Sequence, residues 1–346
     1  MKKEEKVIVG ISVGDLNGIG PEIIIKAYED PRALDLSTPV IFASSKTMQF
    51  FKNHFNSKIN FFSIDKPEKA IHGKVNVVNV WKEPVKIEFG HQNNTIGEYA
   101  IKSLEAATSA LKENKIDVLV TAPINKYNIQ SERFNFPGHT DYLAKALNGN
   151  SLMFMVANSL RVGLLTDHVP IKEASSHITE TLIIEKLQTV IMSLKQDFGI
   201  NRPKIAVLAI NPHAGDNGVI GSEDDTILRP TLEMLRKKGD LIYGPYSADS
   251  FFGSNNYKSF DAIIASYHDQ GLIPFKTIAF GGGVNFTAGL DKVRTSPDHG
   301  TAYEIAGKGK ADENSFVQAI HTAIKVYRNR LEYQHYNKNP LRKVAK

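Results

Sequence analysis

The chain has 346 residues, of which 42% are hydrophobic and 23% charged, values typical of a globular protein with one large domain or two smaller ones. Its net charge of +5 favours an anionic ligand, but no basic run is interleaved with aromatic residues as nucleic-acid binding would require. Because cysteine is absent, disulfides, thiolate nucleophiles and iron–sulfur clusters are excluded, and a metal would need His, Asp, Glu or neutral oxygen ligands. Neither a membrane span nor a secretion signal is evident, so we expect a cytoplasmic protein.

Short runs rich in valine and isoleucine alternate with amphipathic stretches, which is the pattern of an α/β protein. Strands are expected at Val7–Val13, Val40–Ala43, Val75–Val80, Val118–Thr121, Ile205–Ile210 and Ala262–Ser266. The longest predicted helix begins at Thr95, where Thr95-x-x-Glu98 has the spacing of a capping box. Leu152–Val156 and Val162–Leu165 flank Asn158-Ser159 and predict an antiparallel hairpin, so the sheet should be mixed.

Three histidines each follow an apolar run: His168, His213 and His268. In open α/β sheets ligands bind beyond the carboxyl ends of the strands, so the three imidazoles could converge although 45 and 55 residues separate them. Three neutral nitrogens with open coordination positions suit catalytic Zn²⁺ or a similar divalent ion. The alternative is three ordinary hydrogen-bonded histidines at strand ends, and spacing alone does not decide.

Several groups suited to an anion lie elsewhere in the sequence. Gly138-His139-Thr140 opens a predicted helix whose free N–H groups could bind an anion, although an ordinary turn and N-cap would look the same. Lys276, Asn285 and Arg294 follow His268 and supply an ammonium, an amide and a guanidinium, which suit a phosphate or carboxylate. Solvated surface positions are the alternative for the two cations.

Two glycine-containing segments invite a nucleotide-binding interpretation. In Gly14–Gly20 the spacing is wrong for the dinucleotide fingerprint, and Pro21-Glu22 indicates a helix start, so we reject a Rossmann site there. The turn His299-Gly300-Thr301-Ala302, predicted to lead directly into a helix, could hold an adenine nucleotide by backbone contacts and stacking. The alternative is a helix start followed by a glycine C-cap.

Six motifs occur in an order that resembles the 4-hydroxythreonine-4-phosphate dehydrogenase family of pyridoxal phosphate synthesis. They are Gly-Asp-x-x-Gly-Ile-Gly-Pro-Glu at 14–22, Thr-Ala-Pro-Ile-Asn-Lys at 121–126, Gly-His-Thr at 138–140, Asn-Pro-His-Ala-Gly at 211–215, Tyr-His-Asp-Gln-Gly-Leu at 267–272 and Arg-Thr-Ser-x-Asp-His-Gly-Thr-Ala at 294–302. The segment 299–309 is also similar to the cofactor loop of isocitrate and isopropylmalate dehydrogenases.

The resemblance implies a fold like that of isocitrate and isopropylmalate dehydrogenases, with two α/β/α subdomains, a mixed sheet and a cleft between the subdomains. With boundaries at loops rich in Pro, Gly and Asn, residues 1–125 and 275–346 would form the cofactor-side subdomain. Residues 126–274 would carry the metal ligands and the dimer contacts. The family is homodimeric with its active site at the subunit interface, so the three histidines need not come from one chain.

The resemblance also implies roles for individual residues. His168, His213 and His268 would be the metal ligands. His139, Thr140, Lys276, Asn285 and Arg294 would contact substrate. Asp249 and Lys126 are candidates for catalysis or for supporting the ligands, and His299, Gly300, Thr301 and Ala302 for binding the cofactor. Leu16-Asn17 and Asp167 depart from the usual family pattern, and neither change removes a proposed ligand.

The implied activity is NAD- or NADP-dependent oxidation of 4-phosphooxy-L-threonine, with one divalent metal (Zn, Mg or Co) per active site. The product, 2-amino-3-oxo-4-phosphooxybutanoate, would decarboxylate to 3-amino-2-oxopropyl phosphate. A near alternative is a dehydrogenase of 4-phosphoerythronate or 4-phosphothreonate, which shares nearly all these motifs. A distant alternative is a phosphate acyltransferase, which shares the broader fold but needs neither the metal nor nicotinamide.

Overall fold

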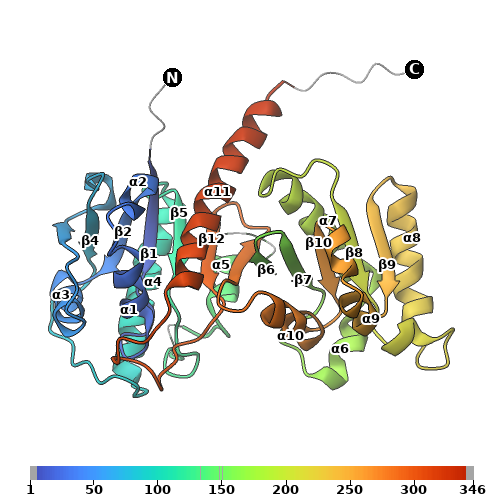
Figure 1. Cartoon of the computed structure of the whole chain (residues 1–346), viewed down its shortest axis with the longest axis horizontal. Helices are drawn as coiled ribbons and strands as arrows, with labels where there is room; N and C mark the ends of the chain where they lie inside the picture. Colours follow the sequence, from blue (N-terminus) through green and yellow to red (C-terminus); the bar gives the residue numbers. More distant parts are fainter. Residues whose placement is uncertain (1–5, 133, 148, 150, 340–346) are drawn as a thin grey trace. The chain divides into compact units, whose positions relative to one another are not determined.

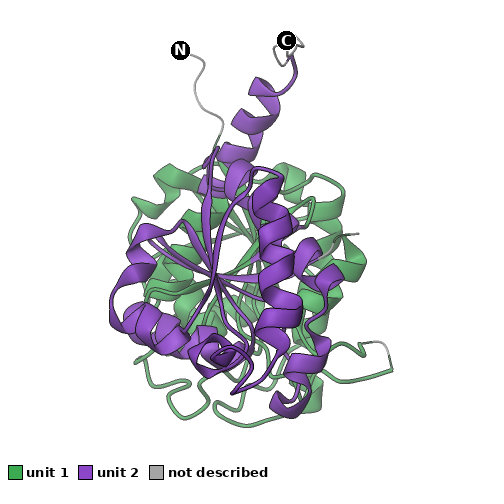
Figure 2. Ribbon diagram, turned by 90° about the vertical axis from the view of Figure 1, so that its right-hand side faces the viewer, with its two compact units in different colours: residues 1–149, 281–286, 290–324 green, residues 150–280, 287–289, 325–346 purple. Residues whose placement is uncertain are grey.

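The computed structural model describes residues 6–132, 134–147, 149 and 151–339. The chain forms two compact units, shown in different colours in Figure 2: residues 1–149, 281–286 and 290–324 make unit 1, and residues 150–280, 287–289 and 325–346 make unit 2. Residues 126–149 thus pack within unit 1, whereas the division expected from sequence put them with the following segment. The two units reflect which residues lie close together in space, and the subdomain boundaries expected from sequence stay a prediction.

Unit 1 is built on a sheet in the strand order β3-β4-β2-β1-β5-β12-β11 (Figure 1). All neighbouring strands are parallel except β11 and β12, which are antiparallel. The strands are β1 (Val7–Ser12), β2 (Ser37–Ala43), β3 (Phe61–Ile64), β4 (Val75–Asn79), β5 (Val118–Thr121), β11 (Val284–Ala288) and β12 (Val293–Pro297). The helices are α1 (Gly20–Ala27), α2 (Ala33–Leu36), α3 (Ser45–His54), η1 (Pro67–Lys69), α4 (Asn94–Lys112) and α5 (His139–Ala146), and α11 (Asn314–Tyr336) begins in this unit.

Unit 2 has its own strand order, β6-β7-β10-β8-β9, with helices on both sides of the strands (Figure 2). β6 and β7 form an antiparallel hairpin, and the neighbours from β7 to β9 are parallel. The strands are β6 (Leu152–Ala157), β7 (Leu160–Leu164), β8 (Lys204–Leu208), β9 (Leu241–Tyr246) and β10 (Ala262–Ala265). The other elements are α6 (Ile171–His177), α7 (Glu180–Gln196), η2 (Pro212–Gly215), η3 (Asp224–Leu228), α8 (Arg229–Lys237), α9 (Ala248–Gly253), η4 (Asn256–Ser259) and α10 (His268–Ile278).

The predicted α/β fold with a mixed sheet is confirmed, and each expected strand is present within a few residues. The β6–β7 hairpin turns at Asn158, whose φ of 51° lies in the left-handed region that asparagine tolerates. The capping box at Thr95 was wrong: the N-cap of α4 is Asn93, whose side chain accepts a hydrogen bond from the N–H of Thr95. The helix expected directly after Ala302 was also wrong, because residues 303–309 form consecutive turns and the next helix begins at Asn314.

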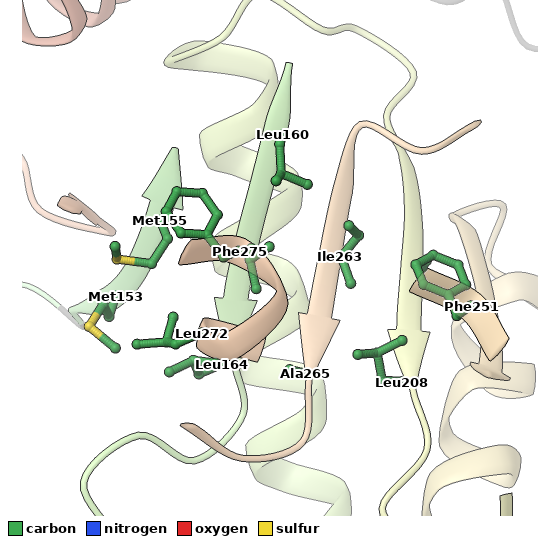
Figure 3. Packing of buried hydrophobic residues seen from close by; sticks show 12 residues of the cluster. Met153, Met155, Leu160, Leu164, Leu208, Phe251, Ile263, Ala265, Leu272 and Phe275 are labelled. Carbon is green, nitrogen blue, oxygen red and sulfur yellow. The ribbon is translucent and has the colours of Figure 1, made fainter. Parts of the chain in front are cut away.

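Helix α10 is anchored in a hydrophobic cluster of unit 2 (Figure 3). Phe275 and Leu272 project from α10 onto the sheet, and the cluster includes Leu164 of β7 and Ala265 of β10. Phe275 is fully buried. A side chain at Gly271 would collide with Ala265 and Leu164, so the helix lies close against these strands. Packing therefore fixes the helix that begins with His268.

Within the described ranges, no helix has the length and apolar character needed to cross a bilayer.

We predict that Phe275→Ala lowers the free energy of unfolding by about 3–5 kcal/mol, because the deletion leaves a cavity in the cluster that anchors α10. Urea unfolding followed by circular dichroism measures the change. The control is Thr277→Ala on the exposed face of the same helix, expected to stay within about 0.5 kcal/mol of wild type. Equal effects of the two substitutions would contradict the anchoring role of Phe275.

Candidate active site

The three histidines follow three neighbouring parallel strands of unit 2. His168 comes after β7, His268 after β10 and His213 after β8, and β10 lies between the other two strands. The register aligns Leu164 with Ala265, and Ile264 with Val207, so these strands end at nearly the same level of the sheet. The parallel direction therefore carries all three histidine-bearing segments to one edge, where ligands bind in α/β proteins.

Side chains join these strand ends beyond the regular sheet. The hydroxyl of Thr166 donates to the carbonyl oxygen of Ser266 (2.7 Å), and the hydroxyl of Ser266 donates to the carbonyl oxygen of Leu208 (3.1 Å). The Gln270 amide accepts from the N–H of Ser266 (2.7 Å) and donates to the carbonyl oxygen of Ala209 (2.6 Å). This network was not predicted from the sequence, because no local pattern distinguishes Thr166, Ser266 and Gln270 from other polar residues that follow a strand.

The segment that carries His213 has an unusual backbone. Residues 213–218 all have positive φ, including 54° at His213 and at Ala214. Because His, Asp and Asn adopt this region more readily than other non-glycine residues, the backbone strain falls mainly on Ala214. The buried carboxylate of Asp224 accepts hydrogen bonds from the N–H groups of Ile210 (2.8 Å) and Asn211 (2.9 Å). These bonds fix the chain just before His213, so the turn starts from a rigid point.

The imidazole groups have polar neighbours suited to orient them. The rings of His168 and His268 have centroids 6.0 Å apart, and Nδ1 of His268 lies 2.7 Å from a carboxylate oxygen of Asp269. Asp249 accepts a 2.7 Å hydrogen bond from the Ser247 hydroxyl, which, with backbone N–H bonds and the neighbouring His213, lowers the pKa of its carboxyl. In the part of this single chain that the structure describes, no three His, Asp or Glu side chains are close enough together to hold a metal. The three-histidine site therefore stays a prediction.

A second set of predicted residues lies in unit 1 around a buried arginine. Arg294 of β12 is 1% exposed, and its Nη2 donates to the hydroxyl of Thr121 at the end of β5 (2.6 Å). Burial lowers the pKa of Arg294 to about 9, which leaves the guanidinium charged at neutral pH. On the adjacent strand Asn285 pairs with Ser296, two residues from Arg294, so Asn285 and Arg294 share one face of the sheet. The Oδ1 atom of Asn285 is buried and has no hydrogen-bond partner within the described chain.

His139 begins helix α5 in the same unit, and Thr140 follows it. Burial, and then the charges of Arg294 and Lys126, hold the pKa of His139 well below its usual range. Its Nε2 atom is buried without a hydrogen-bond partner among the described residues. Together, two cations, a neutral imidazole and a helix N-terminus make this part of unit 1 suited to an anion. Lys276, by contrast, belongs to unit 2, where it is exposed on α10.

The N-terminal glycine motif of unit 1 contacts its own chain. Gly14 has a φ of 67°, and a side chain there would collide with the backbone at Pro123. The buried carboxylate of Asp15 accepts hydrogen bonds from the side chains of Asn128 (2.8 Å) and Tyr303 (2.6 Å). Burial and this carboxylate raise the pKa of the Tyr303 hydroxyl. Asp15, Asn128 and Tyr303 were missed in the sequence, since 113 and 288 residues separate the two partners from Asp15.

The predicted cofactor turn is held by backbone contacts. The carbonyl oxygen of Thr301 accepts a hydrogen bond from the N–H of Ile19 (3.0 Å), and Ala302 has a φ of 44°. The Nε2 atom of His299 is buried and lacks a partner among the described residues, whereas Nδ1 lies 3.1 Å from the Gly300 carbonyl oxygen. Backbone contacts thus hold the turn in place, and its role in binding a cofactor stays a prediction.

An α/β scaffold that carries histidines beyond three parallel strand ends and a buried arginine on another strand is typical of α/β enzymes. The family model described as pyridoxal phosphate biosynthetic protein PdxA matches residues 35–323, and the chain belongs to this family. It is 50% identical over 343 residues to the 4-hydroxythreonine-4-phosphate dehydrogenase of Bacteroides thetaiotaomicron, covering 99% of this chain and 94% of that protein.

Two further relatives bear on the site. The D-threonate 4-phosphate dehydrogenase of Cupriavidus necator is 35% identical and is matched over 90% of this chain and 95% of its own length. Among solved structures, that of 4-hydroxythreonine-4-phosphate dehydrogenase from Klebsiella pneumoniae superposes with a TM-score of 0.81 at 31% identity, over 94% of this chain and 99% of that one. The sequence-based resemblance is confirmed.

We predict that the imidazole of His139 stays neutral down to a pH well below 6.5, because a proton would enter a buried site beside two cations. Long-range ¹H–¹⁵N spectra recorded from pH 7.5 to 5 would follow its titration. Since the unfolded chain takes up a proton near pH 6.5 that the folded chain does not, His139 destabilises the fold progressively as the pH falls below about 6.5. A titration midpoint at or above 6.5 would contradict this environment.

Proposed function

We propose that this protein oxidises 4-phosphooxy-L-threonine with NAD or NADP, as a divalent-metal-dependent dehydrogenase of pyridoxal phosphate synthesis. The observation that carries the proposal is the position of His168, His213 and His268 beyond three neighbouring parallel strands of unit 2. Oxidation of the C3 hydroxyl removes a hydride and a proton and leaves 2-amino-3-oxo-4-phosphooxybutanoate. This β-keto acid then loses CO₂ to give 3-amino-2-oxopropyl phosphate.

The donor set of unit 2 fits a divalent ion such as Zn²⁺, Co²⁺ or Mg²⁺, with the nitrogen ligands favouring the first two. The rings of His168 and His268 lie near each other, with their centroids 6.0 Å apart. Asp269 accepts the Nδ1 hydrogen of His268 and so directs Nε2 toward a ligand. Bound there, the metal would polarise the substrate hydroxyl and ease loss of its proton.

The phosphate of the substrate is proposed to bind in unit 1. Arg294 presents a buried charge, Lys126 adds a second, and His139 and Thr140 open helix α5. Asn285 contributes an amide whose NH2 group can donate to a phosphate oxygen. Arg294 and Lys126 would offset the phosphate's charge of about −1.5 to −2. In unit 2 we propose that Lys276 also contacts the substrate, and that Asp249 supports His213 or accepts a proton.

We propose that NAD or NADP binds at the turn His299–Ala302, where the nicotinamide supplies the hydride acceptor. The turn is fixed to Ile19 through Thr301, and the buried Nε2 of His299 is left to meet the cofactor. The protein is further proposed to be a cytoplasmic homodimer. Phe280 is 95% exposed and Ile171 is 73% exposed in unit 2, which is the unit that carries the histidines. Phe280 and Ile171 are therefore our candidates for contacts across the proposed dimer interface.

The nearest competing function is oxidation of D-threonate 4-phosphate or 4-phosphoerythronate. It is favoured by the similarity to the Cupriavidus necator enzyme, whose substrate lacks the amino group. Side-by-side assays of cofactor reduction with the three phosphorylated acids, each with NAD and NADP, separate the alternatives. A phosphate acyltransferase would show neither cofactor reduction nor a dependence on bound metal.

His213→Ala is expected to abolish turnover and metal retention while leaving the oligomeric state unchanged, because the imidazole is exposed and supports no contact of the core. Metal content after gel filtration and initial rates of cofactor reduction measure the two losses. The control is His177→Ala, an exposed histidine at the end of α6, which should behave as wild type. Full activity of the His213 variant, or activity that survives thorough chelation, would refute the metal mechanism.

Arg294→Lys is expected to lower kcat/KM for the phosphorylated substrate by about 10- to 100-fold, since a charged hydrogen bond contributes about 1.5–3 kcal/mol. The dephosphorylated analogue should lose much less. Lysine keeps the charge but not the planar donor fork, so the comparison isolates hydrogen bonding. The same exchange at Arg330, a buried arginine paired with Asp197 in unit 2, serves as control. Equal losses on both substrates would remove Arg294 from phosphate recognition.

A further inference from the structure

We propose that Gln270 and Ser266 are positioning residues that hold the His213 segment in place beside the other two histidine segments. The inference rests on the proposed function, because it concerns the three-histidine metal site. Neither residue is proposed to touch the metal or the substrate. Their role is to set where the imidazole of His213 stands relative to those of His168 and His268.

The strand ends of unit 2 are joined in two different ways. Between β7 and β10, backbone hydrogen bonds continue beyond the strands: Leu165 donates to Ala265 (2.8 Å) and Thr166 to Ser266 (3.2 Å). Between β10 and β8, no backbone–backbone bond joins residues 266–270 to residues 209–213 in the described chain. That gap is crossed by the side chains of Gln270 and Ser266.

The chemistry of the Gln270 amide matches its two partners. Its oxygen accepts from a backbone N–H and its nitrogen donates to a backbone carbonyl oxygen, so the orientation of the amide follows from the partners. One partner, Ser266, stands two residues before His268, and the other, Ala209, stands four residues before His213. Gln270 itself follows His268 by two residues on α10. A single side chain thus links the segments that carry two of the three predicted ligands.

The other side of the His213 segment offers no comparable link to the histidines. Ala209 donates its N–H to the carbonyl oxygen of Tyr246, which ties the segment to β9 on the outer edge of unit 2. Asp224 accepts hydrogen bonds from Ile210 and Asn211, but it belongs to η3 and does not join the segment to the other two histidines. Loss of the Gln270 and Ser266 bonds would therefore let the His213 segment shift as a unit relative to β7 and β10, which stay joined.

The test is the affinity of the purified protein for Co²⁺, measured by calorimetry and by the visible absorption of the bound ion. Gln270→Met keeps the side-chain length and removes both hydrogen bonds. We expect it to weaken Co²⁺ binding by about 10- to 100-fold, the range seen when groups that orient metal ligands are removed. The bands of the bound ion should also change, because their positions and intensities depend on coordination geometry.

A matched control and a second variant complete the experiment. Gln188→Met makes the same change at an exposed position of α7 and should bind Co²⁺ as wild type does. Ser266→Ala removes only the bond to Leu208 and should weaken binding in the same direction by a smaller factor. If Gln270→Met does not fold, the Co²⁺ affinity of Ser266→Ala alone tests the positioning role.

The outcomes separate this inference from the proposed function. If wild type binds Co²⁺ stoichiometrically and His213→Ala does not, the metal site stands. Wild-type affinity and spectrum in both Gln270→Met and Ser266→Ala would then overturn the positioning role alone. A fall in thermal stability with an unchanged dissociation constant and unchanged bands would overturn it as well. If wild type binds no stoichiometric metal, both proposals fail together.

Discussion

The site of unit 2 depends on how buried backbone groups are satisfied where parallel strands stop. Inside the sheet, ladder hydrogen bonds pair backbone groups of neighbouring strands, but regular pairing stops a few residues beyond Leu164, Leu208 and Ala265, where the chains form loops. Unpaired buried backbone groups are costly, so side chains have to replace the ladder. Ser266 and Gln270 meet this requirement, and the same bonds determine where the histidine segments lie. Protein stability and site geometry are thus secured by one set of contacts.

Unit 1 shows the complementary constraint, which is the burial of charge. A guanidinium as buried as that of Arg294 has lost most of its hydration, and its Nη2 donates a hydrogen bond to the hydroxyl of Thr121. The neighbouring His139 is kept neutral by the same surroundings. In the proposed function, a bound dianion would offset the arginine charge and accept a hydrogen bond from the imidazole. Both interactions would favour a phosphorylated ligand over an unphosphorylated one.

Features set by neighbouring residues in the sequence could be predicted, whereas features set by contacts between distant segments could not. Runs such as Val118–Thr121 and Ile205–Ile210 are apolar and β-branched, so their strands were evident, and histidines placed after such runs marked the edge of the sheet. β9 and β12 were missed because they contain glycine, proline or polar residues and acquire strand geometry from their neighbours. Asn93 displaced Thr95 as the cap of α4, since both lie within one turn and both can cap a helix. The role of Gln270 could not be predicted, because its hydrogen-bond partners depend on which strands are neighbours in the sheet.

The glycines of the N-terminal motif serve the packing of unit 1 and do not form a phosphate-binding loop of the dinucleotide type. Glycines after a first strand suggest phosphate binding, yet the Cβ positions at Gly14, Gly18 and Gly20 are filled by backbone atoms of Pro123, Thr301 and Val13. The glycines let unit 1 bring these segments together, and Asp15 then ties them through Asn128 and Tyr303. A substitution in this motif should therefore disturb the loop around Pro123 and the turn at Thr301 together. The proposed cofactor turn, His299–Ala302, is held by this motif through the hydrogen bond from Ile19 to Thr301, so the proposed site has no need of a dinucleotide fingerprint.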